Sequence, residues 1–320
     1  MALDNIYLIA DALTRDSLKP TGLLCSFQAQ SKVLLVESAW QGRWNRWKYK
    51  IAAYPDYPER NNRQLQRIVE KAKDRGIPTV FWNKEDSVHF DRFIDSAKLF
   101  DHVFTVDETC IPKYKAVMGD DASVHCMMFA VQPKLHYFNG FNFKYSRANF
   151  VGSYSHHVHD IRRAQQNLLF QAAADTALGL TVFDRNSQRK SVNYRYPILP
   201  NMDIKKVLKY GKTGQVYKDY LVSLNVNTIT DSPTMFSRRL VEILACGGIA
   251  VTTPAESVDN LFAEYCHVVH DAIEMRELFA RLKHGPSKDD LARARAGAEY
   301  VAQNHTWAHR LEQMAKVLYG

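Results

Sequence analysis

The sequence predicts an α/β protein with two doubly wound, Rossmann-like parallel-sheet domains that face each other across a cleft. The 320 residues suit two domains of roughly 150 residues, each large enough for its own core. Short apolar segments alternate with longer amphipathic ones, which is the order of strands and helices in a βα repeat. The apolar segments are nearly unbroken, as expected for parallel strands that helices cover on both faces.

The predicted elements follow from these segments in chain order. In the first half we expect strands at residues 6–10, 33–36, 78–82, 102–106 and 126–130. In the second half we expect strands at residues 149–152, 180–183, 220–225, 249–252 and 267–269. Amphipathic helices are predicted at residues 62–75, 90–99 and 161–174.

The interdomain connection is expected at residues 131–147, which lack periodicity and are rich in Lys, Asn, Tyr and Phe. We therefore predict a first domain over residues 1–140 and a second over residues 141–305. A last helix is expected over residues 306–320, with Thr306 as its cap.

Composition narrows the classes of ligand and compartment. The formal net charge of +8 is shared between the two halves, which favours anionic ligands such as nucleotide diphosphates, an anionic acceptor or a membrane face. Five widely spaced cysteines without a C-x-x-C pair argue against a disulfide framework and a structural zinc site. No signal-peptide pattern and no apolar run near ~18 residues is present, so we expect a cytoplasmic protein without a transmembrane segment.

Residues 232–252 are the most informative segment, because they predict a helix followed directly by a strand. Ser232 is a favoured N-cap residue, and Pro233 suits the first helical position. Gly247 and Gly248 suit a left-handed exit from the helix.

Arg238, Arg239 and Glu242 share one face of this predicted helix with Met235. In a helix selected only for stability, an acid four residues before a base is the better order, and here the bases come first. The arrangement suits an anion held by arginines beside a carboxylate that accepts hydrogen bonds from sugar hydroxyls. The alternative is a packed helix whose Arg and Glu side chains pair in solvent.

This segment resembles the donor-site helix of GT-B glycosyltransferases, in which a helix with a Glu is followed by a small residue, Gly-Gly and an apolar strand. Its variant Ser-Arg-Arg-Leu-Val-Glu-Ile-Leu-Ala-Cys-Gly-Gly resembles the CgeB-like branch of these enzymes. Many retaining members carry two glutamates there, eight positions apart, and the second binds the ribose of the nucleotide. Glu242 matches the second glutamate, whereas Thr234 stands at the position of the first. The resemblance implies a GT-B fold in which the helix over residues 306–320 packs back on the first domain.

Two further strand ends are predicted to contribute to the donor site. One is followed by Arg185 and Asn186, and Arg185 could reach the diphosphate or the base. Gly152 and Ser153 end a strand, so that backbone N–H groups and the next helix N-terminus can approach a phosphate. The predicted donor-binding residues are Gly152, Ser153, Tyr154, Arg185, Asn186, Thr234, Met235, Phe236, Arg238, Arg239 and Glu242. His156, His157 and His159 lack the spacing of a zinc pair, and we predict no metal site.

Glu85, Asp86 and His89 are the predicted catalytic residues on the acceptor side. They follow the strand at residues 78–82, and ligand sites in parallel sheets gather at the carboxyl ends of strands. Two carboxylates and a histidine are suited to take a proton from an acceptor hydroxyl. The alternative is a helix N-cap at Asp86 or Ser87. Of the two acids, we expect Asp86 to be the cap and Glu85 the functional group.

Residues 37–50 combine aromatic and basic side chains in an unusual density. Trp40, Trp44 and Trp47 could share a helical face and stack on sugar rings, on bases or at a membrane interface. Packing beneath a loop is the alternative. The resemblance to the CgeB-like branch includes this segment and favours a role on the acceptor side.

The expected activity is the transfer of a sugar from a nucleotide-diphosphate sugar to a hydroxyl acceptor. A UDP-sugar is the expected donor, with no metal or further cofactor, and the acceptor is a glycan, protein or other polymer. One alternative is a glycosyltransferase of nucleic-acid bases, as in phage DNA modification, since the charge permits contact with nucleic acid or a peripheral anionic surface. Another is a nucleotide-sugar-binding protein without activity, because the first glutamate is missing.

Overall fold

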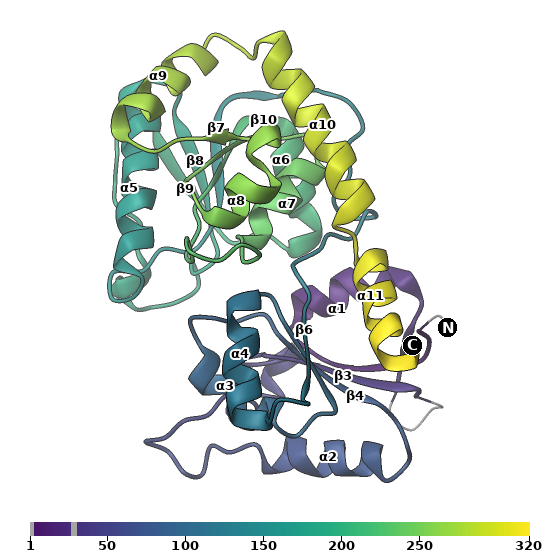
Figure 1. Ribbon diagram of the computed structural model, residues 1–320. Coiled ribbons are helices and arrows are strands. Elements are labelled where there is room, and N and C mark those ends of the chain that lie inside the picture. The colour runs from purple at the N-terminus through teal and green to yellow at the C-terminus, as the bar shows by residue number, and fades with distance from the viewer. Residues whose placement is uncertain (1–2, 27–30) are drawn as a thin grey trace. The chain divides into compact units, whose positions relative to one another are not determined.

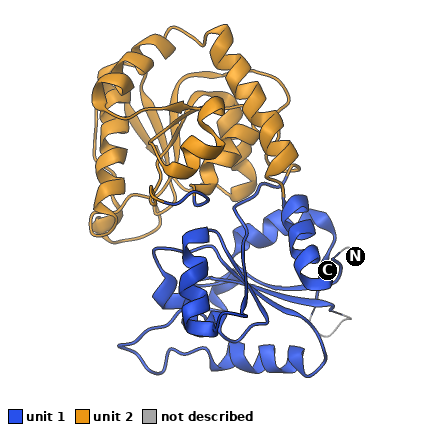
Figure 2. Cartoon of the chain, in the orientation of Figure 1, with its two compact units in different colours: residues 1–132, 232–235, 307–320 blue, residues 133–231, 236–306 orange. Residues whose placement is uncertain are grey.

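The computed structural model describes residues 3–26 and 31–320, which form two compact units (Figure 1). Unit 1 contains the residues up to 132 together with 232–235 and 307–320, and unit 2 contains residues 133–231 and 236–306 (Figure 2). Each unit is built on a parallel sheet, as the sequence predicts. None of the described helices is long and apolar enough to cross a membrane.

The sheet of unit 1 has the strand order β2-β1-β3-β4-β5-β6. Its strands are β1 (Ile6–Ile9), β2 (Leu24–Cys25), β3 (Val33–Glu37), β4 (Thr79–Asn83), β5 (His102–Thr105) and β6 (Ser123–Cys126). Its helices are α1 (Ala12–Leu18), α2 (Arg63–Lys73), α3 (Phe90–Ala97), α4 (Ile111–Met118) and α11 (Trp307–Tyr319). Because successive strand residues point to opposite faces, Phe81 packs with the core beneath α2–α4 while Trp82 meets Trp307 of α11.

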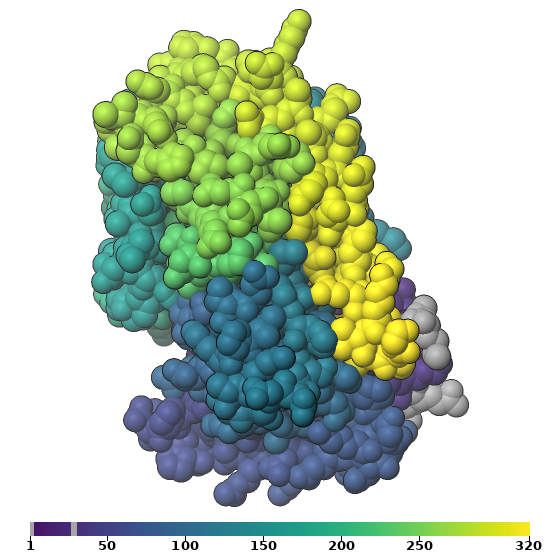
Figure 3. Space-filling model, viewed as in Figure 1, coloured from purple at the N-terminus to yellow at the C-terminus, as the bar shows by residue number. Residues whose placement is uncertain are grey.

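The sheet of unit 2 has the strand order β12-β11-β10-β7-β8-β9. Its strands are β7 (Tyr145–Gly152), β8 (Leu180–Asp184), β9 (Met202–Lys205), β10 (Tyr220–Asn225), β11 (Ile249–Thr252) and β12 (His267–Val268). Its helices are α5 (Asp160–Asp175), α6 (Thr213–Asp219), α7 (Arg238–Ala245), α8 (Glu256–Leu261), α9 (Ala272–Leu282) and α10 (Lys288–Asn304). Helices α10 and α11 lie at the surface of their units (yellow in Figure 3).

Both sheets contain a point at which the strand order reverses. In unit 1 the chain moves outward on one side from β1 to β2 and then returns to place β3 on the other side of β1. In unit 2 the same reversal separates β7 from β10. The loops that follow the two strands diverge at such a switch point. A crevice therefore forms at the carboxyl ends of these strands, and doubly wound folds bind their ligands there.

The predicted strands at residues 220–225 and 249–252 are confirmed, and most others differ from the observed strands by one or a few residues at an end. The prediction at residues 126–130 is wrong, because β6 covers Ser123–Cys126. The apolar residues after it are mostly buried and lie outside the strand, although the Met127 N–H still donates to the Thr105 carbonyl at 2.7 Å. Phe129 packs on Trp82, and the Arg310 guanidinium of α11 donates to the carbonyls of Met128 and Phe129.

The predicted helix start at Ser232 is also wrong, since α7 begins at Arg238 with Ser237 as its N-cap residue. The Ser232 hydroxyl instead donates to the Asp107 carboxylate at 2.8 Å and accepts from the backbone N–H of Met235. The predicted helix exit is confirmed: Gly247 has φ +68°, and a Cβ there would lie 2.3 Å from the Phe138 ring.

The boundary between the units falls earlier than the predicted position after residue 140. His136 hydrogen-bonds Thr213 at 2.9 Å, and Phe138 packs over Gly247, so this segment belongs to unit 2. Helix α11 groups with unit 1, where the backbone N–H of Trp307 donates to the Val131 carbonyl.

Candidate functional site

The switch point of unit 2 holds the side chain of Arg239, which comes from the first turn of α7. Its Nε donates to the Val151 carbonyl at 2.6 Å, and its Nη1 donates to Asn225 Oδ1 at 3.3 Å. A Cβ on Gly152 would lie 2.8 Å from Arg239 Nη2 and 2.5 Å from the Phe150 ring. A glycine at the end of β7 therefore permits the guanidinium to reach this edge.

Two more arginines lie close to Arg239 in unit 2. Burial, together with the positive charges of Arg162 and Arg185, lowers the pKa of Arg239 to about 10. Arg162 comes from α5, and the backbone N–H of Arg185 donates to the Gly152 carbonyl at 2.8 Å. Guanidinium groups repel one another but bind phosphate oxygens with matched geometry. The three arginines therefore indicate an anion site at the ends of β7 and β8.

Glu242 lies one turn beyond Arg238 on α7 and is almost fully buried. Its Oε1 accepts from Arg238 Nε at 3.0 Å, and its Oε2 accepts from the Tyr217 hydroxyl at 3.4 Å. Burial alone would raise the pKa of Glu242, but the charge of Arg238, the hydrogen bond from Tyr210 and the charge of Arg239 outweigh this effect and hold the pKa below its usual value. Glu242 is therefore an ionised hydrogen-bond acceptor beside the arginines.

The remaining predicted donor residues divide into two groups. Ser153 and Asn186 follow β7 and β8, and the backbone N–H of Asn186 donates to Asp184 at 2.7 Å. The side chains of Tyr154 and Phe236 are both buried in unit 2, and their contact with the donor stays a prediction. The Tyr154 hydroxyl donates to Asn167, and Phe236 packs on Phe262 and His305.

Thr234 and Met235 group with unit 1, whereas α7 belongs to unit 2, and their role at the donor stays a prediction. The Thr234 hydroxyl donates to the Val106 carbonyl and accepts from the backbone N–H of Glu108 at 2.9 Å. These contacts hold the segment against the loop that follows β5, a contact that the sequence pattern does not indicate.

Sequence reasoning missed several side chains that complete the site in unit 2. They are His136, Arg162, Tyr210, Tyr217 and Asn225. Asn225 ends the strand predicted at residues 220–225, so its place at the carboxyl end of a parallel strand indicates a site residue. No local pattern marks His136 or Tyr217, because tertiary contacts alone bring them to Glu242.

The switch point of unit 1 holds a lysine between two carboxylates. Lys84 Nζ lies 3.0 Å from Glu37 Oε1 and 2.9 Å from Asp11 Oδ2. Glu37 is fully buried and also accepts from the backbone N–H of Asp11 and from the Thr14 hydroxyl. This network joins the carboxyl ends of β1, β3 and β4.

Glu85 and His89 lie beside Trp40, at the loop after β4. Trp40 Nε1 donates to Glu85 Oε2 at 3.1 Å, and the His89 and Trp40 rings meet edge to face at a centroid distance of 5.0 Å. Burial lowers the pKa of His89, and the nearby Glu85 charge opposes this shift. A half-buried carboxylate and a neutral imidazole are thus neighbours, as proton transfer requires.

Asp86 is not the predicted helix cap, since α3 begins at Phe90 with His89 at its N-cap. Its side chain is fully buried and accepts hydrogen bonds from Asn83, Thr105 and Tyr114 at 2.7–2.9 Å. Burial raises the pKa of Asp86 to about 7, although the two hydroxyl hydrogen bonds oppose the shift. Asp86 therefore anchors the loop that carries Glu85.

The tryptophans of residues 40–47 do not share a helical face. Trp44 has φ +58° within the short 3-10 helix Arg43–Asn45 and is 68% exposed. Trp40 packs on Phe93, whereas the Arg43 guanidinium covers Trp44 at 3.9 Å. The segment is an irregular connection that divides its rings between the core and the surface.

Asp86 should make stability depend on pH. Its folded-state pKa of about 7 exceeds the ordinary value of 3.8, so the folded chain holds more protons than the unfolded chain between these values. The free energy of unfolding should therefore fall as pH rises from about 5 to 8, and Asp86→Asn should reduce this fall. Urea unfolding of both proteins at the two pH values measures it. Parallel pH dependences of the two proteins would contradict the assignment.

Comparisons with known proteins agree with the geometry. A family model described as glycosyl transferase-like matches residues 149–316, more than half of the chain. No curated protein matches the chain. A sucrose-phosphate synthase from Thermosynechococcus elongatus has a TM-score of 0.54 and 11% identity, over 96% of this chain and 77% of its own.

Two further solved structures share the architecture. A UDP-forming trehalose-phosphate synthase from Burkholderia xenovorans has a TM-score of 0.52 and 10% identity, over 96% of this chain and 78% of its own. An α-glucosyltransferase in complex with UDP-glucose and DNA has a TM-score of 0.58 and 12% identity, over 97% of this chain and 84% of its own. The chain belongs to the glycosyl transferase-like family and is a glycosyltransferase with the GT-B fold.

Proposed function

We propose that this glycosyltransferase binds a UDP-sugar in unit 2 and transfers the sugar to a hydroxyl of an acceptor held by unit 1, without a metal ion. The observation that carries the proposal is the group of three arginines beside the buried, ionised Glu242. A nucleotide sugar presents a diphosphate next to a ribose, which is the pair of groups that cations and a carboxylate recognise.

The arginines would stabilise the departing diphosphate. In the reaction the bond between the sugar C1 and the diphosphate oxygen breaks, and the electron pair leaves with that oxygen. The acceptor oxygen forms the new bond to C1 and loses its proton. Fixed cations aimed at the leaving oxygen lower the barrier because they need no reorganisation as charge develops. Arg239 is held in this way by Val151 and Asn225.

Glu242 would accept hydrogen bonds from the ribose hydroxyls. Two features support a uridine nucleotide as the carrier: one fold neighbour was solved with UDP-glucose, and another is described as UDP-forming. The match of Glu242 to the ribose-binding glutamate of the resembling enzymes adds to this support.

Glu85 is the group that we propose as the base for the acceptor hydroxyl in a reaction that inverts C1. Trp40 Nε1 orients its carboxylate, and His89 lies next to the same indole ring. The buried Asp86 is left out of this role and keeps the loop in place through Tyr114 and Thr105.

Glu242→Gln should weaken the binding of UDP by about 1–3 kcal/mol, because a hydrogen bond to a charged acceptor is replaced by one to a neutral group. Isothermal titration calorimetry measures the change. Glu277→Gln, an exposed position on α9 of the same unit, is the matched control and should bind UDP normally. Equal UDP affinity of both variants would remove Glu242 from the site.

Glu85→Gln should lower turnover by roughly 10²–10⁴ and leave UDP affinity unchanged, because the amide cannot take up the acceptor proton. A coupled assay for UDP release measures turnover, and Glu70→Gln on the exposed side of α2 is the control. Normal turnover of Glu85→Gln would reject this base and favour a retaining reaction.

Turnover should survive an excess of EDTA, because cationic side chains are proposed to hold the diphosphate in place of a metal ion. The UDP-release assay with and without the chelator tests this. The proposal of metal independence fails when chelation abolishes turnover and magnesium or manganese restores it.

A further inference from the structure

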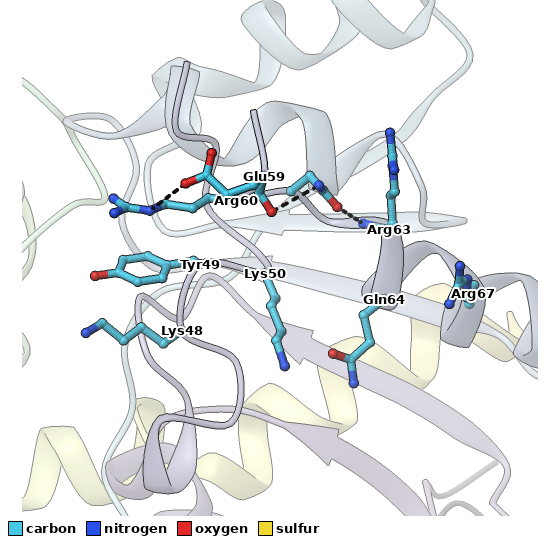
Figure 4. Close-up of a pocket in the computed structure, with 9 residues that line it drawn as sticks. Lys48, Tyr49, Lys50, Glu59, Arg60, Arg63, Gln64 and Arg67 are labelled. Carbon is cyan, nitrogen blue, oxygen red and sulfur yellow. Dashed lines mark hydrogen bonds and ion pairs between the residues drawn. The ribbon is translucent and has the colours of Figure 1, made fainter. Parts of the chain in front are cut away.

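A pocket of about 550 Å³ on unit 1 is lined mainly by basic side chains (Figure 4). It lies between the chain segment 48–50, which follows β3, and the first turns of α2. We call it the basic pocket. Its charged residues are Lys48, Lys50, Glu59, Arg60, Arg63 and Arg67.

The charge of the basic pocket is not compensated by the protein. Glu59 is its one lining acid, and its carboxylate lies 3.5 Å from Arg60 Nε. Across the residues that the structure describes, Lys48, Lys50, Arg63 and Arg67 form no salt bridge. Surfaces that serve only solubility mix both signs of charge, so this pocket offers a site for a multiply charged anion.

Aromatic rings hold the cations of the basic pocket in place. The Arg60 guanidinium lies 4.2 Å from the Tyr49 ring centroid and 3.8 Å from that of Tyr57. Lys48 Nζ lies 4.7 Å from the Tyr49 centroid, and Figure 4 shows Lys48 and Arg60 on opposite sides of this ring. Both faces of Tyr49 are therefore occupied by cations, and the ring is not free to stack on a base or a sugar.

Arg63 and Arg67 extend the positive charge along α2. They lie four residues apart on this helix and are both exposed, so their side chains emerge from one face about one turn apart. Two guanidinium groups in this arrangement can each bind one phosphate of a chain of phosphates. A single small anion would use only part of such a surface.

Aromatic contacts connect the basic pocket to Glu85. Tyr49 meets Tyr54 at a centroid distance of 5.1 Å, and Tyr54 meets Trp40 at 6.4 Å. Trp40 then donates its hydrogen bond to Glu85. The basic pocket and the proposed base are thus joined by packed rings within the same unit.

We propose that the basic pocket binds backbone phosphates of the acceptor, and that the acceptor is a phosphodiester-linked polyol or glycan. The occupied faces of Tyr49 favour such a polymer over a nucleic acid, whose bases gain affinity by stacking on free aromatic rings. This proposal rests on the proposed function only where it calls the polymer the acceptor. The binding of the polymer itself is measured without a donor.

The test uses the double variant Arg63→Ala/Arg67→Ala and fluorescently labelled poly(glycerol phosphate). Anisotropy titrations at several salt concentrations give the affinity and its salt dependence. We expect at least a ten-fold loss of affinity at low salt. The slope of log affinity against log salt should fall by about 1.4–1.8, because each phosphate contact contributes about 0.7–0.9.

The matched control is Lys283→Ala/Lys288→Ala, which removes the same charge from exposed positions of unit 2 and should keep wild-type affinity and slope. Both double variants should bind UDP normally, so a loss of polymer binding is separated from a failure of the donor site. Equal losses in the two double variants, or no loss in either, would overturn the proposal.

A second arm replaces the polymer with oligo-dT that carries the same number of phosphates. Similar affinity for both polymers, lost together in Arg63→Ala/Arg67→Ala, supports recognition of the phosphate backbone. A preference of wild type for oligo-dT by ten-fold or more would overturn the proposal and assign the pocket to nucleic acid.

Discussion

The position of the Arg239 guanidinium is the constraint on which the proposed donor site of this enzyme depends. A half-buried cation is costly unless its donors are satisfied, and here the carbonyl of Val151 and the amide oxygen of Asn225 accept from it. The Phe150 ring lies beneath it at 4.3 Å. These partners come from β7 and β10, the two strands on either side of the switch point. They are neutral, so the positive charge is stabilised by the protein but not cancelled, and it is available to an anionic ligand.

The same constraint explains why β7 ends in glycine. Any Cβ at Gly152 would collide with the ring of Phe150 and the guanidinium of Arg239. From the sequence alone, this glycine is expected to leave room for a phosphate to approach the backbone. The structure gives it a second function, because the space that glycine leaves open is occupied by the side chain that is proposed to bind the phosphate.

The parts of the fold that sequence could predict depend on local spacing. The βα alternation, the strands at 220–225 and 249–252, and the shared face of Arg238 and Glu242 all follow from periods of two or 3.6 residues. The start of α7 could not be predicted in this way. Ser232 is a good cap by type, but its hydroxyl binds Asp107, which lies 125 residues away in sequence. A contact at such a distance competes with local capping, and no spacing rule reveals it.

Glu85 and Asp86 show the same limit within one dipeptide. Capping rules favoured Asp86, yet Thr105 and Tyr114 arrive from β5 and α4 to enclose it, and burial then raises its pKa to about 7. Glu85 remains at the half-buried side of the loop, where Trp40 reaches it. Neighbours in sequence therefore acquire different chemistry, because tertiary contacts decide which carboxyl group is enclosed.

The two units differ in the charge at the carboxyl ends of their strands. Arg239 of unit 2 has neutral hydrogen-bond partners, whereas Lys84 of unit 1 is paired with carboxylates, and the proposed chemistry accounts for this difference. A leaving diphosphate needs cations that the protein has not neutralised, which unit 2 provides at Arg239. A general base is weakened by a free cation close to it. Lys84 is the residue before Glu85, and its charge is compensated by Glu37 and Asp11. Unit 1 places several uncompensated cations in the basic pocket, where we propose that an anionic acceptor binds.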